Sequence, residues 1–523
     1  MNQLEQLLNK LRNPSLYDHP TVGFSIIETH ISYVLLTGQY VYKFKKPLDL
    51  DFLNFSKLED RLYYCQEEVR LNQKMAANIY LGVVKITGDL ENPEINGDGP
   101  VIEYAVKMRE FPQQFIFDHL LINQQISPHL IRETAHIIAE FHQNIAIGLA
   151  DNPYGTYTQV QEPVIQNFQQ IGDFLNDDSD IKELSLISDW AEAEHKKLKD
   201  IITHRKLNGF VRECHGDIHL GNIALMNEKP VIFDCIEFND SFRWTDTIAD
   251  IGFLVMDLED KQKPELANQL INHYLHESQD YQGLYMLRYY KSYRAVIRAK
   301  IALFQKNQEI KISEQLKCWQ QYKNCMQLAA HYCQVTQPLL LITHGLTATG
   351  KSSIAEYLVK KTGVIHINSD ITRKKLTGQS LTSQNQTPTY QGIYSHEMTE
   401  TVYNQLRETA QVILESGFSV IVDATFIKKK HRQRFKQLAV THQVNFKIIH
   451  TIMDENKILE WLARRQQQTY QISEAREDIY QALKQNLEPL TDEEKADAII
   501  LDTLDKHIVE KKLHPLVHQL RSY

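Results

Sequence analysis

The segment HGDIHLGN, residues 215–222, places a carboxylate and a carboxamide in one short loop that contains two glycines. Transfer of a phosphoryl group from ATP needs metal ions on the phosphate oxygens, a cation beside the triphosphate and a carboxylate that orients the attacking hydroxyl. In a loop of this length, Asp217 can face the acceptor hydroxyl while Asn222 turns back to bind Mg²⁺. The apolar stretch VIFD then ends at Asp234, which could meet the same ion. These residues predict a phosphotransfer site.

The cation of such a site is expected from a strand upstream. Lys43 lies in the alternating stretch VYKFKKP, and Glu68 lies in the helical segment that follows. An ion pair between them would hold the lysine amine towards the alpha and beta phosphates of the nucleotide. Lys45 and Glu67 are the neighbouring alternatives.

A second motif, GLTATGKS at residues 345–352, has the pattern of a phosphate-binding loop. An apolar strand, QPLLLITHG, precedes the loop, and a helical stretch, SSIAEYLVKK, follows it. Backbone N–H groups of such a loop wrap a triphosphate at the positive end of the helix. Lys351 would contact the beta and gamma phosphates, and Ser352 would bind Mg²⁺. The residues expected around the nucleotide are Gly345, Leu346, Thr347, Ala348, Thr349, Gly350, Lys351, Ser352 and Ser353.

Three further groups could complete the second site. Asp423 ends the apolar strand in FSVIVDATF, where a carboxylate can hold metal-bound water or activate an acceptor. Asp370 and Arg373, in INSDITRKKL, follow another strand of the same segment and could face the acceptor. Arg464 and Arg465, in ILEWLARRQQQ, are candidates for a lid arginine that closes over the transferring phosphate. A solvated helix face is the alternative for the two arginines.

The elements around these motifs divide the chain in two. Residues 24–49 alternate as short strands, and residues 54–75 have the spacing of an amphipathic helix. More strands follow, and the chain after Pro112 is mostly helical. From QPLLLITHG onward, apolar strands alternate with helical stretches, which predicts a parallel sheet wrapped by helices. We expect one domain at residues 1–335 and another at residues 336–523.

Length and composition restrict the class of protein. A chain of 523 residues is too long for one core. Lys and Arg number 57 against 66 for Asp and Glu, and the formal charge of -9 argues against a general affinity for nucleic acid or an anionic membrane. The six cysteines have no zinc-binding spacing. No apolar run marks a signal peptide or a membrane span, so we expect a cytoplasmic protein with no membrane partner.

The order of lysine strand, glutamate helix, H-G-D-x-H-x-x-N motif and strand-borne aspartate resembles the aminoglycoside phosphotransferase and choline kinase branch of the protein-kinase-like fold. The resemblance implies an α+β domain with a small strand-rich lobe and a larger helical lobe. It makes Asp217 the catalytic base, Asn222 and Asp234 the Mg²⁺ ligands, and Lys43 the phosphate-binding lysine. No convincing glycine-rich loop lies upstream of the motif, so the nucleotide lid is unassigned.

Other polar residues near the first motif have two interpretations. The resemblance implies that His215 braces the loop by hydrogen bonds. Acidic residues after Asp234 suggest a cationic or polyhydroxylic acceptor, and these residues are Glu237, Asp240, Asp246 and Asp250. The alternative is that Arg243, Asp246 and Asp250 form a helix-capping and salt-bridge set, which is the default role of such residues.

The second half, over about residues 338–503, resembles the P-loop kinases related to polynucleotide kinase, gluconate kinase and zeta toxin. That resemblance implies an α/β P-loop NTPase domain with a parallel sheet. It makes Asp370, Arg373, Asp423 and Arg432 acceptor-side or catalytic candidates. The whole chain resembles bacterial proteins that join an aminoglycoside phosphotransferase family domain to an ATP-binding kinase domain.

The expected activity is ATP-dependent phosphorylation of small-molecule hydroxyl groups, with a separate Mg-ATP site in each domain. One alternative makes the C-terminal domain an ATP-binding regulatory module for the first domain. Another makes it a kinase of nucleic-acid ends or nucleotide sugars, in which the basic run at residues 428–432 guides a phosphate backbone. Such runs are most often solvated faces, so a nucleic-acid partner is not expected. The sequence gives no indication of oligomeric state.

Overall fold

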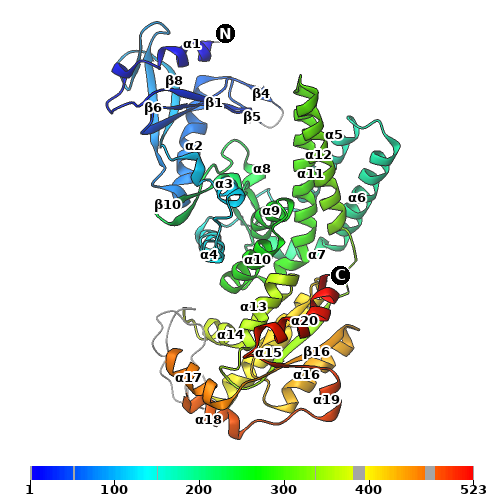
Figure 1. Ribbon diagram of the computed structural model, residues 1–523. Coiled ribbons are helices and arrows are strands. Elements are labelled where there is room, and N and C mark those ends of the chain that lie inside the picture. The colour runs from blue at the N-terminus through cyan, green and yellow to red at the C-terminus, as the bar shows by residue number, and fades with distance from the viewer. Residues whose placement is uncertain are drawn as a thin grey trace. The chain divides into compact units, whose positions relative to one another are not determined.

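The computed structural model describes residues 3–50, 53–149, 151–335, 337–380, 395–465 and 477–521 (Figure 1). The chain forms two compact units. The first comprises Met1–Asp177 and Glu192–Asp257, and the second comprises Asp178–Ala191 and Leu258–Tyr523. Within the described residues, no helix is both long enough and apolar enough to cross a lipid bilayer.

A six-stranded antiparallel sheet opens the first unit, with the strand order β1-β2-β3-β8-β6-β7. Apolar residues of α1, including Leu4, Leu7 and Leu8, pack in one core with Tyr33, Leu35 and Phe44 of the sheet. Helix α2 contacts β6 and β8. The elements are α1 (Gln3–Lys10), β1 (Ser25–Glu28), β2 (Ser32–Leu36), β3 (Tyr40–Lys45), α2 (Leu58–Ala76), β6 (Tyr80–Gly88), β7 (Pro93–Ile95) and β8 (Val101–Arg109).

The rest of the first unit is mainly helical and holds the first motif. The motif lies between β9 and β10, and the paired strands β10 and β11 lead from it towards Asp234. Strand β12 pairs with β9 directly before α9. The elements are α3 (Phe117–Ile122), α4 (Pro128–Asn144), α5 (Tyr157–Gly172), α6 (Asp178–Lys197), α7 (Lys199–Leu207), β9 (Val211–Glu213), β10 (Ile223–Met226), β11 (Lys229–Ile232), α8 (Asp240–Arg243), β12 (Trp244–Asp246) and α9 (Thr247–Asp260). Residues 178–191 of α6 and the end of α9 from Leu258 group with the second unit.

The second unit contains a five-stranded parallel sheet with the order β14-β15-β13-β16-β17. Buried residues of β13, α13 and α20 form its main core cluster, because both faces of a parallel sheet are covered by helices. The strands are β13 (Leu339–His344), β14 (Ile365–Asn368), β15 (Val420–Asp423), β16 (Asn445–Ile452) and β17 (Ala498–Asp502).

The helices of the second unit include three that precede the sheet in the chain. These are α10 (Pro264–Ser278), α11 (Leu284–Gln308) and α12 (Ile312–Tyr332). The others are α13 (Lys351–Thr362), α14 (Ser369–Leu376), α15 (His396–Glu415), α16 (Lys429–Thr441), α17 (Glu455–Arg465), α18 (Glu477–Gln485), α19 (Asp492–Ala496) and α20 (Lys506–Arg521).

The fold class expected from the sequence is confirmed. A strand-rich lobe and a helical region occupy the N-terminal part, and the parallel sheet follows a P-loop arrangement. The expected boundary near residues 335–338 differs from the division into compact units, because α10, α11 and α12 group with the parallel sheet. Periodicity identifies helices, but it carries no information on which sheet a helix packs against.

Two candidate active sites

The first motif is anchored by Asp250, a fully buried carboxylate of α9. Its Oδ2 accepts a hydrogen bond from the backbone N–H of His215 at 3.0 Å, and its Oδ1 accepts one from Gly216 at 2.9 Å. His142 of α4 lies 3.1 Å away through Nε2. Burial raises the pKa of Asp250, but the hydrogen bond and charge of His142 outweigh burial and lower it. The carboxylate therefore stays ionised and fixes the start of the loop.

Two further contacts hold the loop. Asp257, about two turns beyond Asp250 on α9, accepts a hydrogen bond from the N–H of Leu220 at 2.9 Å. His215 Nε2 donates to the carbonyl of Phe233 at 2.9 Å, and burial lowers the pKa of this imidazole. His215 is therefore neutral and ties the motif to the segment that carries Asp234, as expected for a bracing residue.

Asn222 directly precedes β10, Asp234 follows the end of β11, and Asp217 is hydrogen-bonded to Asn222. The Asn222 side-chain N–H donates to the Asp217 carbonyl at 3.1 Å and to its carboxylate at 3.3 Å. The backbone carbonyl of Asn222 accepts a hydrogen bond from Phe233, the residue before Asp234, at 3.0 Å. The Asp217 and Asp234 side chains are 37% and 45% exposed. Because the amide nitrogen of Asn222 is used, its oxygen is the atom suited to a cation.

A buried charge network joins β3, α2 and the segment after β11. Lys43 Nζ donates to Glu68 at 2.7 Å and to Asp234 at 2.6 Å. Lys45 donates to the other oxygen of Glu68 at 2.7 Å and also pairs with Glu237. Burial lowers the pKa of Lys43, but the charges of Asp234 and Glu68 raise it well above its usual value. Lys43 and Glu68 thus form the pair that the sequence favoured, and Lys45 is a second lysine on the same carboxylate.

The structure removes the support that the acidic residues after Asp234 gave to a cationic or polyhydroxylic acceptor. Each carboxylate of that cluster is bound to a group of the protein itself. Glu237 pairs with Lys45, Asp240 with Arg243, and Asp246 with Arg205 at 2.6 Å, while Asp250 holds the motif loop. The salt-bridge interpretation is therefore right for Asp246, whereas Asp250 braces the motif loop through backbone hydrogen bonds.

The second motif curls between β13 and α13 with the backbone that a phosphate-binding loop requires. Gly345 and Gly350 have φ angles of +147° and +86°. A Cβ on Gly345 would lie 2.6 Å from the carbonyl oxygen of Thr451, so no larger residue fits there. Lys351 Nζ reaches back across the loop and donates to the carbonyl of Leu346 at 2.6 Å. The lysine amine thus lies against the backbone of its own loop.

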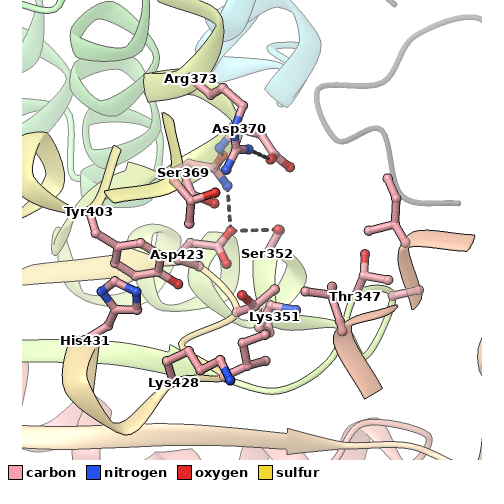
Figure 2. A pocket seen from close by; sticks show the side chains of 18 of the residues that line it. Thr347, Lys351, Ser352, Ser369, Asp370, Arg373, Tyr403, Asp423, Lys428 and His431 are labelled. Carbon is pink, nitrogen blue, oxygen red and sulfur yellow. Dashed lines mark hydrogen bonds and ion pairs between the residues drawn. The ribbon is translucent and has the colours of Figure 1, made fainter. Parts of the chain in front are cut away.

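Asp423 lies directly beside the loop at the end of β15. Its Oδ2 accepts hydrogen bonds from the Ser352 hydroxyl at 2.7 Å and from the Asn368 amide at 2.8 Å, and Figure 2 shows Ser352 pointing at the carboxylate. Nε2 of His366 lies 3.4 Å from the same oxygen. Burial raises the pKa of Asp423, but His366, Lys351 and Ser352 outweigh it and lower the pKa to about 2. A serine hydroxyl beside an ionised carboxylate is an oxygen donor set that suits Mg²⁺.

A pocket extends from the phosphate-binding loop past Asp423. Arg373 and Asp370 line it as an ion pair of 2.9 Å, and the His431 ring is stacked on Tyr403 at 3.9 Å between ring centres (Figure 2). Burial lowers the pKa of His431 to about 4, so this imidazole is neutral. Other lining residues are Asn368, His396, Glu400, Lys428, Lys430, Trp461, Ile479 and Leu483. The pocket has room for an acceptor beyond the site expected for the gamma phosphate.

Several of these lining residues were not identified from the sequence. Asn368 accepts hydrogen bonds from the N–H groups of Asp370 and Ile371 and so caps α14. Its position directly before an acidic helix start is a recognisable capping signal. Tyr403 and His431 lie on separate helices, α15 and α16, and carry no spacing signal that links them.

The expected role of Arg432 is corrected by its surroundings. Its side chain is 1% exposed, and its guanidinium donates to Glu494 at 2.8 and 3.0 Å. It also donates to the carbonyls of Phe426, Glu488 and Pro489. All three nitrogens are thus engaged in bracing the chain, which is a structural role. Arg464 is in α17, but its side chain and that of Arg465 lie outside the described residues.

The basic run at residues 428–432 is largely neutralised in place. Lys428 pairs with Glu488 at 3.2 Å, and Lys430 pairs with Glu400. His431 is neutral, and Arg432 is buried. This segment offers less positive charge to a phosphate backbone than its sequence suggests.

Two family models match separate segments of the chain. A model described as a phosphotransferase enzyme family matches residues 116–287, and a model described as an AAA domain matches residues 340–490. Uncharacterized proteins of Mycobacterium tuberculosis and Mycobacterium bovis are 25% identical to this chain over 430 residues, which cover 81% of this chain and 83% of theirs.

Solved structures that are similar to the chain match only a share of its length. A choline/ethanolamine kinase family protein of Mesorhizobium loti covers 64% of this chain and 98% of its own, at 11% identity and a TM-score of 0.38. A gluconokinase of Sinorhizobium meliloti covers 36% of this chain and 94% of its own, at 15% identity and a TM-score of 0.25.

The family matches confirm the resemblance found in the sequence. The chain carries a phosphotransferase domain and a P-loop kinase-like domain, and it is an enzyme of the kinase type.

Proposed function

We propose that the protein is a bifunctional ATP-dependent kinase that phosphorylates hydroxyl groups of small molecules, with one Mg-ATP site in each part. The observation that carries the proposal is the presence of two separate sets of groups for phosphotransfer. One set is the triad Asp217, Asn222 and Asp234 with Lys43, and the other is the phosphate-binding loop with Asp423.

At the first site, Asp217 orients the acceptor hydroxyl and accepts its proton as the oxygen bonds to the gamma phosphorus of ATP, and the bond from that phosphorus to the bridging oxygen breaks to release ADP. Its exposed carboxylate and its hydrogen bond with Asn222 suit this role. Asn222 and Asp234 would hold Mg²⁺, which neutralises charge on the phosphate oxygens. Lys43 would hold the alpha and beta phosphates, and Glu68 keeps the lysine amine in place.

At the second site, the loop N–H groups and Lys351 would hold the beta and gamma phosphates. Ser352 and Asp423 would hold Mg²⁺. Asp370 and Arg373 lie on the pocket wall beyond Asp423, where they would face the acceptor. This extension of the pocket favours a transferase over a module that only binds ATP. A pure binding module has no need for an acceptor wall.

The test is a screen of sugars, amino sugars and nucleosides for acceptor-dependent ADP formation by the intact chain. An acceptor of the first site should lose its turnover in Asp217→Asn and keep it in Lys351→Ala, and an acceptor of the second site should show the reverse. An acceptor whose turnover is indifferent to both substitutions would overturn the assignment of both sites. ATP hydrolysis at the second site that no acceptor accelerates would instead favour a regulatory module.

A further inference from the structure

Helix α10 lies along the open edge of the parallel sheet. Strand β14 is the last strand on its side and pairs only with β15 among the described strands, so one row of its backbone groups needs other partners. Asn272 of α10 bonds to one residue of β14 and to the residue directly before the strand. Its side-chain oxygen accepts from the N–H of His366 at 2.7 Å, and its amide donates to the carbonyl of Val364 at 3.3 Å.

His276, one turn further along α10, supplies another hydrogen-bond partner to the edge strand β14. Its Nε2 donates to the carbonyl of His366 at 2.8 Å, and the two imidazole rings meet edge to face at 5.1 Å. Burial lowers the pKa of His276 well below its usual value, so the ring is neutral and has one N–H to donate. Both the N–H and the carbonyl of His366 are therefore held by α10.

Contacts on either side keep α10 against the sheet. Glu265 pairs with Lys361 of α13 at 2.5 Å, and Lys375 of α14 donates to the carbonyl of Glu277 at 2.9 Å. Asn268 approaches the backbone so closely that a Cβ on Gly363 would lie 2.8 Å from its side-chain oxygen. Helix α10 is thus held by the helices before and after β14. The domain boundary expected from the sequence places α10 in the first domain.

His366 is the residue that connects α10 to the second site. His366 is held at its backbone by α10, and its side chain lies 3.4 Å from Asp423, the carboxylate that binds Ser352. Both side chains are buried, at 7% and 2% exposure. A buried side chain behind a ligand fixes the orientation of that ligand and commonly changes metal affinity when it is removed.

We infer that α10 is a working part of the P-loop site: Asn272 and His276 act as positioning residues that set His366 behind Asp423 and so set the Mg²⁺ side of the site. This inference rests on the proposed function of the second site. It goes beyond that function because it makes a helix outside the expected P-loop domain necessary for a correctly formed site.

The experiment uses the full chain with Lys43→Met, which weakens the first site so that ATP titration reports the second. The measured quantity is the ratio of ATP affinity with Mg²⁺ to ATP affinity in EDTA. His366→Leu and His276→Leu should lower this ratio by about threefold to tenfold, with the EDTA affinity unchanged because the loop and Lys351 are intact. His276→Gln should restore it, since a glutamine amide can donate to the same carbonyl.

Controls separate the possible failures. Gln269→Leu is the matched control, because Gln269 lies on α10 and, among the described residues, its side chain bonds to the carbonyl of Glu265 alone, in its own helix; it should leave the ratio unchanged. If Lys351→Ala leaves ATP binding intact in this background, the proposed second site is wrong. If Lys351→Ala removes binding but His276→Leu and His366→Leu keep the full ratio, only the role of α10 is wrong. Equal loss in the leucine and glutamine variants would also contradict it, since positioning predicts rescue.

Discussion

Lys43 and Asp234 are 191 positions apart in the chain, and their charged groups lie 2.6 Å from each other. The contact links the strand-rich sheet to the segment that follows the first motif. It also pairs the lysine expected to hold phosphates with a carboxylate expected to hold Mg²⁺. Under the proposed function, binding of Mg-ATP inserts the nucleotide between these two groups, so each exchanges its present partner for a group of the ligand.

The two lysines on Glu68 should behave differently when each is replaced. Lys43→Met should reduce first-site turnover by about 100-fold or more, because the phosphates lose their cation, with a small change in melting temperature. Lys45 is fully buried. Lys45→Met should therefore destabilise the fold by about 3–5 kcal/mol, since Glu237 and Glu68 lose a buried partner. Turnover assays and urea unfolding measure the two effects, and equal loss of stability in both variants would contradict this division.

Weakening the Asp250 anchor of the first motif should reduce turnover more than it weakens nucleotide binding. In Asp250→Asn, one of the side-chain atoms that now accept from His215 and Gly216 becomes a donor, so the loop loses part of its anchor. We expect first-site kcat to fall by about 10-fold to 100-fold, with the ATP dissociation constant changed by less than about threefold. Steady-state kinetics together with calorimetry would test this. Loss of ATP binding with an unchanged kcat would contradict it.

The Glu68 network should make stability depend on acid pH. Burial raises the pKa of Glu68, but the charges of Lys43 and Lys45 lower it from 4.5 to about 2. A carboxyl whose pKa is depressed in the folded state stabilises the fold above its unfolded pKa, and this contribution is lost as pH falls towards the folded pKa. The gap in melting temperature between wild type and Glu68→Gln should therefore shrink from pH 7 to pH 3.

The control for this pH effect is Glu59→Gln, an exposed position on the same helix. Its melting temperature should follow that of wild type at both pH values. A gap between wild type and Glu68→Gln that stays constant from pH 7 to pH 3 would show that the ion pairs do not cause it.

Replacing Arg432 should lower the stability of the second unit, whereas replacing Arg373 should affect its catalysis. Arg432→Leu should cost about 3–5 kcal/mol of stability, because Glu494 is left buried without its partner. The protein that remains folded should bind ATP normally. Arg373→Leu should leave the melting temperature within about 2 °C and raise KM for the acceptor of the second site. Thermal unfolding and kinetics check the pair, and an acceptor effect of Arg432→Leu without loss of stability would reverse the assignment.

Local sequence patterns are sufficient to predict several groups of the two sites. Glycines and lysine at fixed spacing predicted the phosphate-binding loop, and strand alternation with the helix that follows indicated the Lys43–Glu68 pair. The alternation of strands and helices predicted the parallel sheet that places Asp423 beside Ser352. In each case the relevant geometry is set by elements that are neighbours in the chain or by a general rule of sheet assembly.

The rest depended on contacts between distant segments. Arg432 has the charge and location of a catalytic arginine in sequence, but Glu494, 62 positions later, takes its guanidinium. Asn272 and His276 look like ordinary polar positions of a helix, and only packing shows that they bond to His366 of β14, 94 and 90 positions away. The role of Asp250 also depends on a distant segment. Its two oxygens accept hydrogen bonds from His215 and Gly216, which lie 35 and 34 positions earlier in the chain.

Calorimetric titration of the intact chain with Mg-ATP tests the central claim most directly. Two separate sets of phosphotransfer groups predict two nucleotides bound per chain, with one lost in Lys351→Ala and the other in the double variant Lys43→Met, Asp234→Asn. A single nucleotide bound per wild-type chain, or two that both persist in Lys351→Ala, would contradict the account.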